Sequence, residues 1–64
     1  MPYINIKVTD TAVTREQKAL LIAGATELLV KVLGKNPETT FVIIDEVSTD
    51  NWGIGHKQVS ELLD

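Results

Sequence analysis

A strand pattern, a long helix pattern and a second strand pattern follow one another in this chain, and that order most constrains its fold. Residues 2 to 8 alternate polar and apolar side chains, so Ile4, Ile6 and Val8 share one face of an extended strand. Residues 39 to 46 are β-branched and almost entirely apolar, which is typical of a central strand. A strand, a crossover helix and another strand form a right-handed unit with parallel strands. The predicted fold is therefore α/β, a single β-α-β unit.

The helix between these strands is predicted over residues 15 to 33. Thr14 and Gln17 have the spacing of a capping box at its start, and Gly34 and Pro37 are typical of a helix end. Its apolar positions form a stripe at i, i+3, i+4 spacing, widened by five further apolar residues. One face of the helix can cover the chain's own sheet, so the apolar residues outside that face predict contact with a partner. The stripe consists of Leu21, Ile22, Ala25, Leu28, Leu29 and Val32, and Ala19, Leu20, Ala23, Val30 and Leu33 widen it.

Length and composition indicate one domain, residues 1–64, that does not stand alone. The chain has 64 residues, 44% of them hydrophobic, and no cysteine. A chain this short buries too little surface to hide so much apolar material, and no disulfide can help it. We therefore expect a homo-oligomer in which subunits supply the missing core, with sheets joined between subunits.

The same composition disfavours several classes of function. The net charge is −3 and no basic run occurs, which argues against nucleic-acid binding. A single histidine without cysteine makes a structural zinc site unexpected, and no cofactor or metal is predicted. No apolar run approaches the roughly 18–20 residues of a membrane span, and no signal peptide precedes the first strand. We expect a cytoplasmic protein without a membrane partner.

Pro2 is an unusual first residue for a strand, and it has two interpretations. A proline has no N–H for a ladder, so strands tolerate it at their first residue, where it stiffens the chain end. Its position after Met1 suggests a second role, because a small second residue normally permits removal of the initiator. An α-amino group titrates at roughly 7.7–8.0, and apolar burial or a nearby cation lowers that pKa. A free Pro2 amine would then accept a proton at neutral pH.

The C-terminal segment holds candidates with open alternatives. Gly53 and Gly55 permit a tight turn, and residues 57 to 64 fit either a short strand or a helical turn. Trp52, the only tryptophan, is either a packing anchor at a subunit interface or an aromatic wall over a pocket. His56 either titrates near neutrality or lies in solvent without a special role.

Asp45 and Glu46, at the end of the second strand, are adjacent carboxylates and so are candidates for a paired general acid and base. Adjacent residues of a strand point to opposite faces. This excludes the two residues as a paired general acid and base.

The order of four segments resembles the 4-oxalocrotonate tautomerase family, small tautomerases with an N-terminal proline. No single segment is strongly specific, but their combination along so short a chain is. The segments are Pro2 at the start of the first strand, Glu16-Gln17-Lys18 in the capped helix, Val42-Ile43-Ile44-Asp45-Glu46 in the second strand, and Trp52-Gly53-Ile54-Gly55.

The resemblance implies a fold, an assembly and a mechanism. It implies a β-α-β subunit with a short C-terminal hairpin, two subunits joining their sheets, and dimers assembling into a hexamer with a hydrophobic interior. It implies that Pro2, as a free amine, moves a proton between carbon and oxygen of a keto–enol substrate. It also implies that Trp52 reaches the pocket from a neighbouring subunit.

The sequence departs from the family where substrate binding is concerned. Two arginines are expected, one in the loop after the first strand and one in the second strand. Residues 9 to 13 contain no arginine, and Phe41 and Val42 stand where the second is expected. The single arginine, Arg15, begins the helix, so a bidentate carboxylate fork is missing. A cation from a neighbouring subunit could replace the missing arginines, and the sequence does not select among four candidates: Lys7, Lys18, Lys35 and His56.

Three hypotheses follow. The first is a cofactor-free isomerase in which Pro2 is general base and acid on a small 2-hydroxy-dienoate or aryl-enol, with Trp52 and Phe41 lining the pocket. The second is a non-catalytic oligomeric protein that kept the fold and lost the arginines; a retained Met1 would support it. The third is a related activity of the same amine, such as decarboxylation or hydration, which the missing arginines also disfavour.

Overall fold

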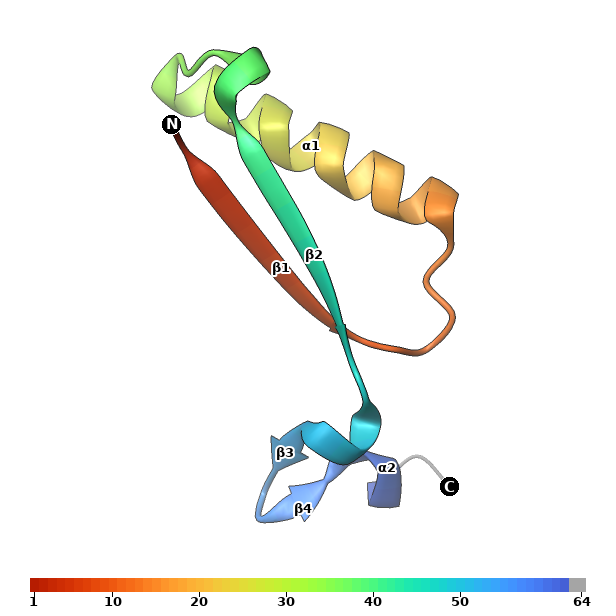
Figure 1. Cartoon of the computed structure of the whole chain (residues 1–64). Helices are drawn as coiled ribbons and strands as arrows, with labels where there is room; N and C mark the ends of the chain where they lie inside the picture. The colour runs from red at the N-terminus through yellow and green to blue at the C-terminus, as the bar shows by residue number, and fades with distance from the viewer. Residues whose placement is uncertain (63–64) are drawn as a thin grey trace.

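The computed structural model describes residues 1–62 and has the predicted α/β architecture (Figure 1). Strands β1 and β2 pair in parallel and are connected by helix α1, while β3 and β4 form a short antiparallel hairpin. The predicted β-α-β unit with a C-terminal hairpin is therefore confirmed. The elements are β1 (Tyr3–Thr9), α1 (Arg15–Leu33), the 3-10 turn η1 (Pro37–Thr39), β2 (Phe41–Val47), the 3-10 turn η2 (Thr49–Asn51), β3 (Gly53–Ile54), β4 (Lys57–Gln58) and α2 (Val59–Leu62).

Helix α1 begins and ends at the predicted residues because local side chains cap both ends. The Gln17 N–H donates to the Thr14 hydroxyl over 3.1 Å, and the Thr14 N–H donates to the Gln17 side chain over 2.9 Å. At the other end Gly34 adopts a φ of 64°, and its N–H donates to the Val30 carbonyl over 3.0 Å. The predicted capping box and helix terminator are both confirmed.

The strand ends differ from the prediction by one or two residues. The strand expected from Thr39 begins instead at Phe41, because Asn36 accepts from the Glu38 N–H over 2.9 Å and Pro37 opens a 3-10 turn. β1 in turn runs to Thr9 rather than ending at residue 8.

Pairing of the two strands gives their sheet two distinct faces. The register sets Tyr3 opposite Phe41, continues residue by residue and ends with Thr9 opposite Val47. Glu46 forms an ion pair with Lys18 of α1, so the even-numbered residues of β2 face the helix. The covered face consists of Ile4, Ile6, Val8, Val42, Ile44 and Glu46. The open face consists of Tyr3, Asn5, Lys7, Thr9, Phe41, Ile43, Asp45 and Val47.

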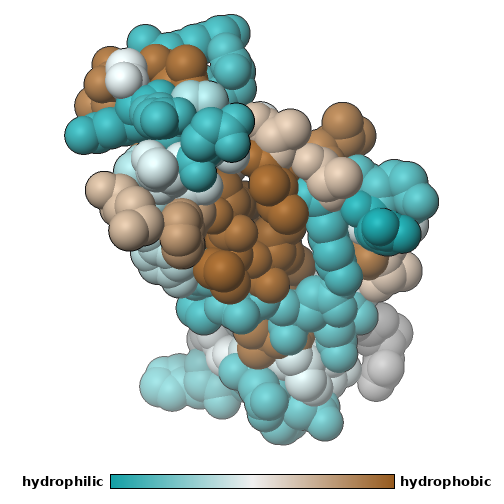
Figure 2. All heavy atoms as spheres, turned by 45° about the horizontal axis from the view of Figure 1, so that its top comes forward, coloured by the Kyte–Doolittle hydropathy of each residue, from teal (hydrophilic) through white to brown (hydrophobic). Residues whose placement is uncertain are grey.

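The chain by itself has almost no interior. None of residues 1–62 is fully buried, and the radius of gyration is 14.7 Å, whereas about 11 Å is typical of a compact domain this long. Of the predicted apolar stripe on α1, Ala25 and Leu29 are half-buried, but Leu28 and Val32 stay exposed. Figure 2 shows a continuous hydrophobic area on one side of the chain with hydrophilic residues around it. This much uncovered apolar surface is what the composition predicted for a subunit.

The C-terminal segment lies beyond the ends of β1 and β2 (Figure 1). Gly55 and His56 form its two-residue hairpin turn with φ of 57° and 70°, both in the left-handed region that such turns require. Residues 57 to 64 were expected to form either a short strand or a helical turn, and the segment contains both, first β4 and then α2. Leu63 and Asp64 lie outside the described residues. Within residues 1–62, no helix is long and apolar enough to cross a membrane.

Candidate active site

Pro2 is held at the entrance of β1 by its carbonyl group. That oxygen accepts the Phe41 N–H over 2.9 Å, while the pyrrolidine nitrogen has no hydrogen to give to the ladder. Pro2 is half-buried and Met1 before it is 90% exposed. The structure therefore brings Pro2 and Phe41 together, with the Phe41 side chain 53% exposed on the open face.

Trp52 lies at the other end of the strand pair, where it lines a hollow. The hollow has a volume of about 300 Å³ and is formed by Lys7, Val47, Asn51, Trp52 and Gly53. The Trp52 carbonyl accepts the Val59 N–H over 2.8 Å, which ties the tryptophan to the start of α2. This volume is at the lower end of the range for small-molecule sites. Only a small ligand fits it.

Pro2 and Trp52 do not meet within one chain. Pro2 precedes β1, and Trp52 follows β2, and each strand has seven residues. At about 3.3 Å per residue, the two ends are roughly 20 Å apart. A site that contains both residues needs two copies of the chain, each contributing one of them.

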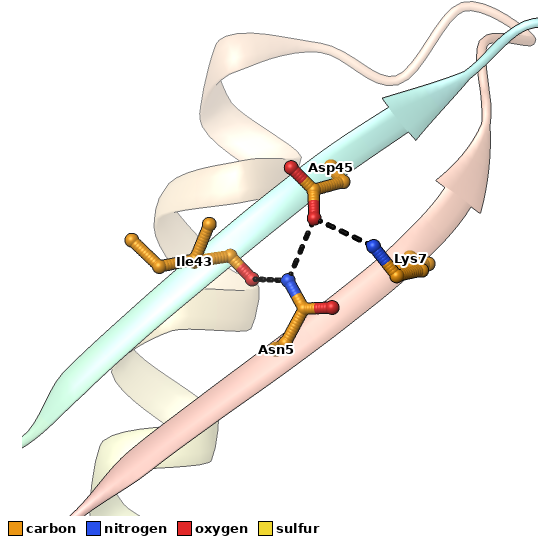
Figure 3. A network of polar contacts seen from close by, with 4 residues as sticks. All are labelled: Asn5, Lys7, Ile43 and Asp45. Atoms are coloured by element: carbon orange, nitrogen blue, oxygen red, sulfur yellow. Dashed lines mark hydrogen bonds and ion pairs between the residues drawn. The ribbon is translucent and has the colours of Figure 1, made fainter.

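A polar cluster on the open face connects β1 to β2 beside the hollow (Figure 3). Lys7 donates to the Asp45 carboxylate over 2.9 Å, and Asn5 donates to the same oxygen over 2.8 Å and to the Ile43 carbonyl over 3.3 Å. The Asn5 hydrogen bond, then the hydrogen bond and charge of Lys7, hold the pKa of Asp45 below its ordinary value.

Sequence reasoning missed this cluster. Its only signal was the register that sets Lys7 opposite Asp45, and register is not readable from either strand alone. The prediction that Asp45 and Glu46 point to opposite faces is confirmed, since Glu46 pairs with Lys18 on the covered face.

The remaining candidate residues lie away from the hollow. Lys18 is engaged with Glu46, Arg15 is the first residue of α1, and Lys35 follows the other end of that helix. His56 occupies the hairpin turn. Among residues 1–62, no three His, Asp or Glu side chains are placed to hold a metal ion.

Comparison with known proteins identifies relatives over nearly the whole chain. A family sequence model described as "Tautomerase enzyme" matches residues 2–62. A relative from Dickeya dadantii (strain 3937), named "Probable tautomerase K2", is 66% identical over 61 residues, covering 95% of this chain and 91% of the relative.

Solved structures share the fold. The crystal structure of DmpI from Helicobacter pylori is 48% identical, with a TM-score of 0.88 over 95% of this chain and 94% of that one. A structure from work on the 4-oxalocrotonate tautomerase isozymes of Methylibium petroleiphilum is 30% identical, with a TM-score of 0.89 over 98% and 100%. A heterohexamer 4-oxalocrotonate tautomerase from Chloroflexus aurantiacus J-10-fl is 24% identical, with a TM-score of 0.88 over 97% and 98%, and shares the fold.

Proposed function

The chain belongs to the tautomerase family, and from that membership we propose that it is a cofactor-independent keto–enol tautomerase with Pro2 as its general base and acid. The family and the fold support a tautomerase activity. The observation that carries the role of Pro2 is its hydrogen bond to Phe41, which fixes the proline through its carbonyl and leaves its nitrogen outside the ladder. The sheet therefore positions Pro2, while the pyrrolidine nitrogen takes no part in the hydrogen bonds between the strands.

The proposed reaction moves one proton and needs no co-reactant. After removal of Met1, the Pro2 nitrogen takes the proton of the enol hydroxyl; the O–H bond breaks, the carbonyl forms, and electron density moves to the distal carbon. That carbon then takes a proton from the resulting secondary ammonium, which returns Pro2 to its starting state. Met1 is 90% exposed, which leaves it accessible to an aminopeptidase.

The proposed site lies between copies of the chain. Pro2 and Phe41 of one copy meet the Trp52 hollow of another, in a homo-oligomer whose most favoured form is a hexamer built as a trimer of dimers. The separation of Pro2 from Trp52 along the strands supports this arrangement, as does the uncovered apolar surface. The apolar surroundings favour the neutral amine over the ammonium and so lower the pKa of such a base. The substrate is a small 2-hydroxy-dienoate or aryl-enol, since Phe41 and Trp52 provide aromatic walls.

A non-catalytic oligomeric protein is the alternative, and one observation favours it. The chain has a single arginine, Arg15, and it begins α1. No second arginine is available to bind a substrate carboxylate beside Pro2. A protein of this kind would assemble in the same way and turn over no enol. It would also tolerate a retained Met1, which makes the Pro2 nitrogen an amide without basicity.

The deciding experiment compares the two prolines of the chain, Pro2 and Pro37. Intact mass of the untagged protein first establishes that Met1 is removed. The kcat/KM for ketonisation of phenylenolpyruvate, followed by the loss of enol absorbance, is expected to fall about 100-fold or more in Pro2→Ala. Pro37→Ala, in the 3-10 turn η1, is expected to keep the wild-type rate. Equal rates in both variants, with the oligomer intact, would refute Pro2 as the base.

A further inference from the structure

We propose that Lys7 is the anion-binding residue of the Trp52 hollow, and that the hollow accepts a small aromatic monocarboxylate. The proposal rests on the proposed function only in treating this hollow as the substrate's binding site. It assigns a specificity-determining residue to a site from which the expected arginines are missing. It also selects one of the four cations that the sequence left open.

Position singles out Lys7. Among the residues that the structure describes, it is the one cation that lines the hollow with Trp52. Lys18 is held against Glu46 on the covered face, and neither Lys35 nor His56 contributes to the lining. A lysine beside a half-buried tryptophan offers a ligand both a charge and a flat apolar surface.

The Lys7 ammonium is held in place with donors to spare. One of its three hydrogens goes to Asp45 over 2.9 Å, which leaves two for a ligand. Asn5 donates to the same Asp45 oxygen over 2.8 Å and so fixes the carboxylate that anchors the lysine. Asp45 is ionised at neutral pH like any ordinary aspartate, and its lowered pKa keeps this anchor in place in more acidic solution as well.

The charge around the hollow favours one carboxylate over two. Lys7 is a point charge on a flexible stem and lacks the planar fork with which arginine grips a carboxylate through two bonds. Asp45 offsets part of its charge and repels a second anion brought close to it. A hollow of about 300 Å³ has room for about one ring and one acidic group.

The test uses Trp52 as its own reporter, because it is the only tryptophan in the chain. Phenylacetate and its neutral isostere phenylacetamide are titrated into the full-length assembled protein, and quenching of Trp52 fluorescence gives each dissociation constant. The wild type is expected to prefer phenylacetate. Lys7→Met is expected to weaken phenylacetate about tenfold, the loss of one charge-assisted hydrogen bond, and to leave phenylacetamide unchanged.

Matched variants separate a binding role from a structural one. Lys31→Met removes the same charge from the exposed surface of α1 and is expected to bind like the wild type. Lys7→Arg keeps the charge and is expected to retain the preference for the anion. Lys7→Met leaves the Asp45 carboxylate without its cation, and that carboxylate could itself repel the ligand. The double variant Lys7→Met/Asp45→Asn removes this charge too, and its affinity for phenylacetate is expected to stay as low as that of Lys7→Met.

Two results would overturn the proposal: phenylacetate affinity unchanged by Lys7→Met, or a wild type that does not distinguish the acid from the amide. Because these are binding equilibria, they do not depend on turnover. A protein that binds phenylacetate through Lys7 but fails the enol assay would lose the proposed tautomerase activity and keep this binding role. If turnover depends on Pro2 but phenylacetate affinity does not depend on Lys7, the proposed tautomerase activity would stand and the binding role of Lys7 would be lost.

Discussion

The two faces of the β1–β2 sheet have the same backbone and opposite surroundings. The covered face is aliphatic along most of its length and is closed at one end by the ion pair of Lys18 with Glu46. The open face has aromatic residues at the Pro2 end, the polar cluster in its middle and the Trp52 hollow at the far end. The covered face is completed by the chain's own helix. The open face presents Phe41 and Lys7, to which we assign binding roles, between Pro2 at one end and Trp52 at the other.

Asp45 and Glu46 show how sharply one step along a strand separates these roles. Asp45 organises Asn5 and Lys7 on the open face, while its neighbour binds Lys18 of the helix. The pleat of the strand accounts for this difference, because successive side chains point to opposite sides. Two chemically similar residues therefore have different roles: Asp45 orders the polar cluster of the open face, and Glu46 ties the helix to the sheet.

The largest effect is expected from Ile43→Asp on the open face. Ile43 is 46% exposed in the single chain, where a charge would be tolerated at a cost of about 0.5 kcal/mol or less. If partner copies cover this face, as we propose, the variant places a carboxylate in an apolar interface and the oligomer should dissociate at micromolar concentration. Sedimentation velocity measures the outcome directly.

Ala12→Asp is the matched control for this variant. Ala12 is exposed in the loop after β1 and has a φ of 63°, a conformation that aspartate adopts more readily than most residues. It adds the same charge away from the sheet and should keep the wild-type assembly. An intact oligomer in Ile43→Asp would place the open face in water and remove the basis for a site shared between copies.

The sequence predicted the parts of this molecule that depend on nearby residues. The ends of α1 follow from the Thr14–Gln17 capping box and from Gly34, which act within a few residues of themselves. The opposite directions of Asp45 and Glu46 follow from the pleat alone. The start of β2 was misplaced because Asn36 and Pro37 form a local turn that competes with the strand tendency of Thr39.

What could not be predicted depends on the register and on distant contacts. Lys7 reaches Asp45, 38 positions further along the chain, and the hollow because β2 returns alongside β1 in one particular register. Nothing in either strand's pattern specifies that alignment. The distance between Pro2 and Trp52 likewise follows from strand length and parallel direction, so the shared site that we propose needs a second copy of the chain, which one sequence does not describe.

A smaller effect is expected on acidification through Asp45. Its pKa is lowered by Asn5 first and then by Lys7, so the folded state binds this proton less readily than the unfolded chain. The stabilisation is fully present above the unfolded pKa of about 3.9 and is lost as pH falls through the folded value. Urea unfolding should therefore show a smaller loss of stability between about pH 5 and pH 3 in Asp45→Asn than in the wild type.

Asp10→Asn provides the comparison for the acid titration. Asp10 is exposed in the loop after β1, so this variant removes one carboxylate elsewhere on the chain. Its loss of stability on acidification should follow that of the wild type more closely than does the loss in Asp45→Asn. The same acid sensitivity in Asp45→Asn as in the wild type would contradict the role of the polar cluster.

The smallest effect is expected on the covered face, from the ion pair of Lys18 with Glu46. Both side chains are about one-third exposed, at 35% and 36%, so their coupling in a double-mutant cycle of Lys18→Met and Glu46→Gln should be about 0.2–1 kcal/mol. The single-chain structure makes the Lys7–Asp45 pair the more exposed of the two, at 60% and 45%. In water it should therefore couple more weakly.

Assembly should reverse that order, because a partner copy on the open face removes water from Lys7 and Asp45 while the Lys18–Glu46 pair keeps its surroundings. Measuring both cycles by urea unfolding of the intact oligomer tests this reversal. A stronger coupling for Lys7–Asp45 would mean that the face left uncovered by the single chain is the more enclosed one in the working protein. A weaker coupling would mean that the pair remains in solvent, and the hollow beside it would then be an open surface site rather than an enclosed pocket between subunits.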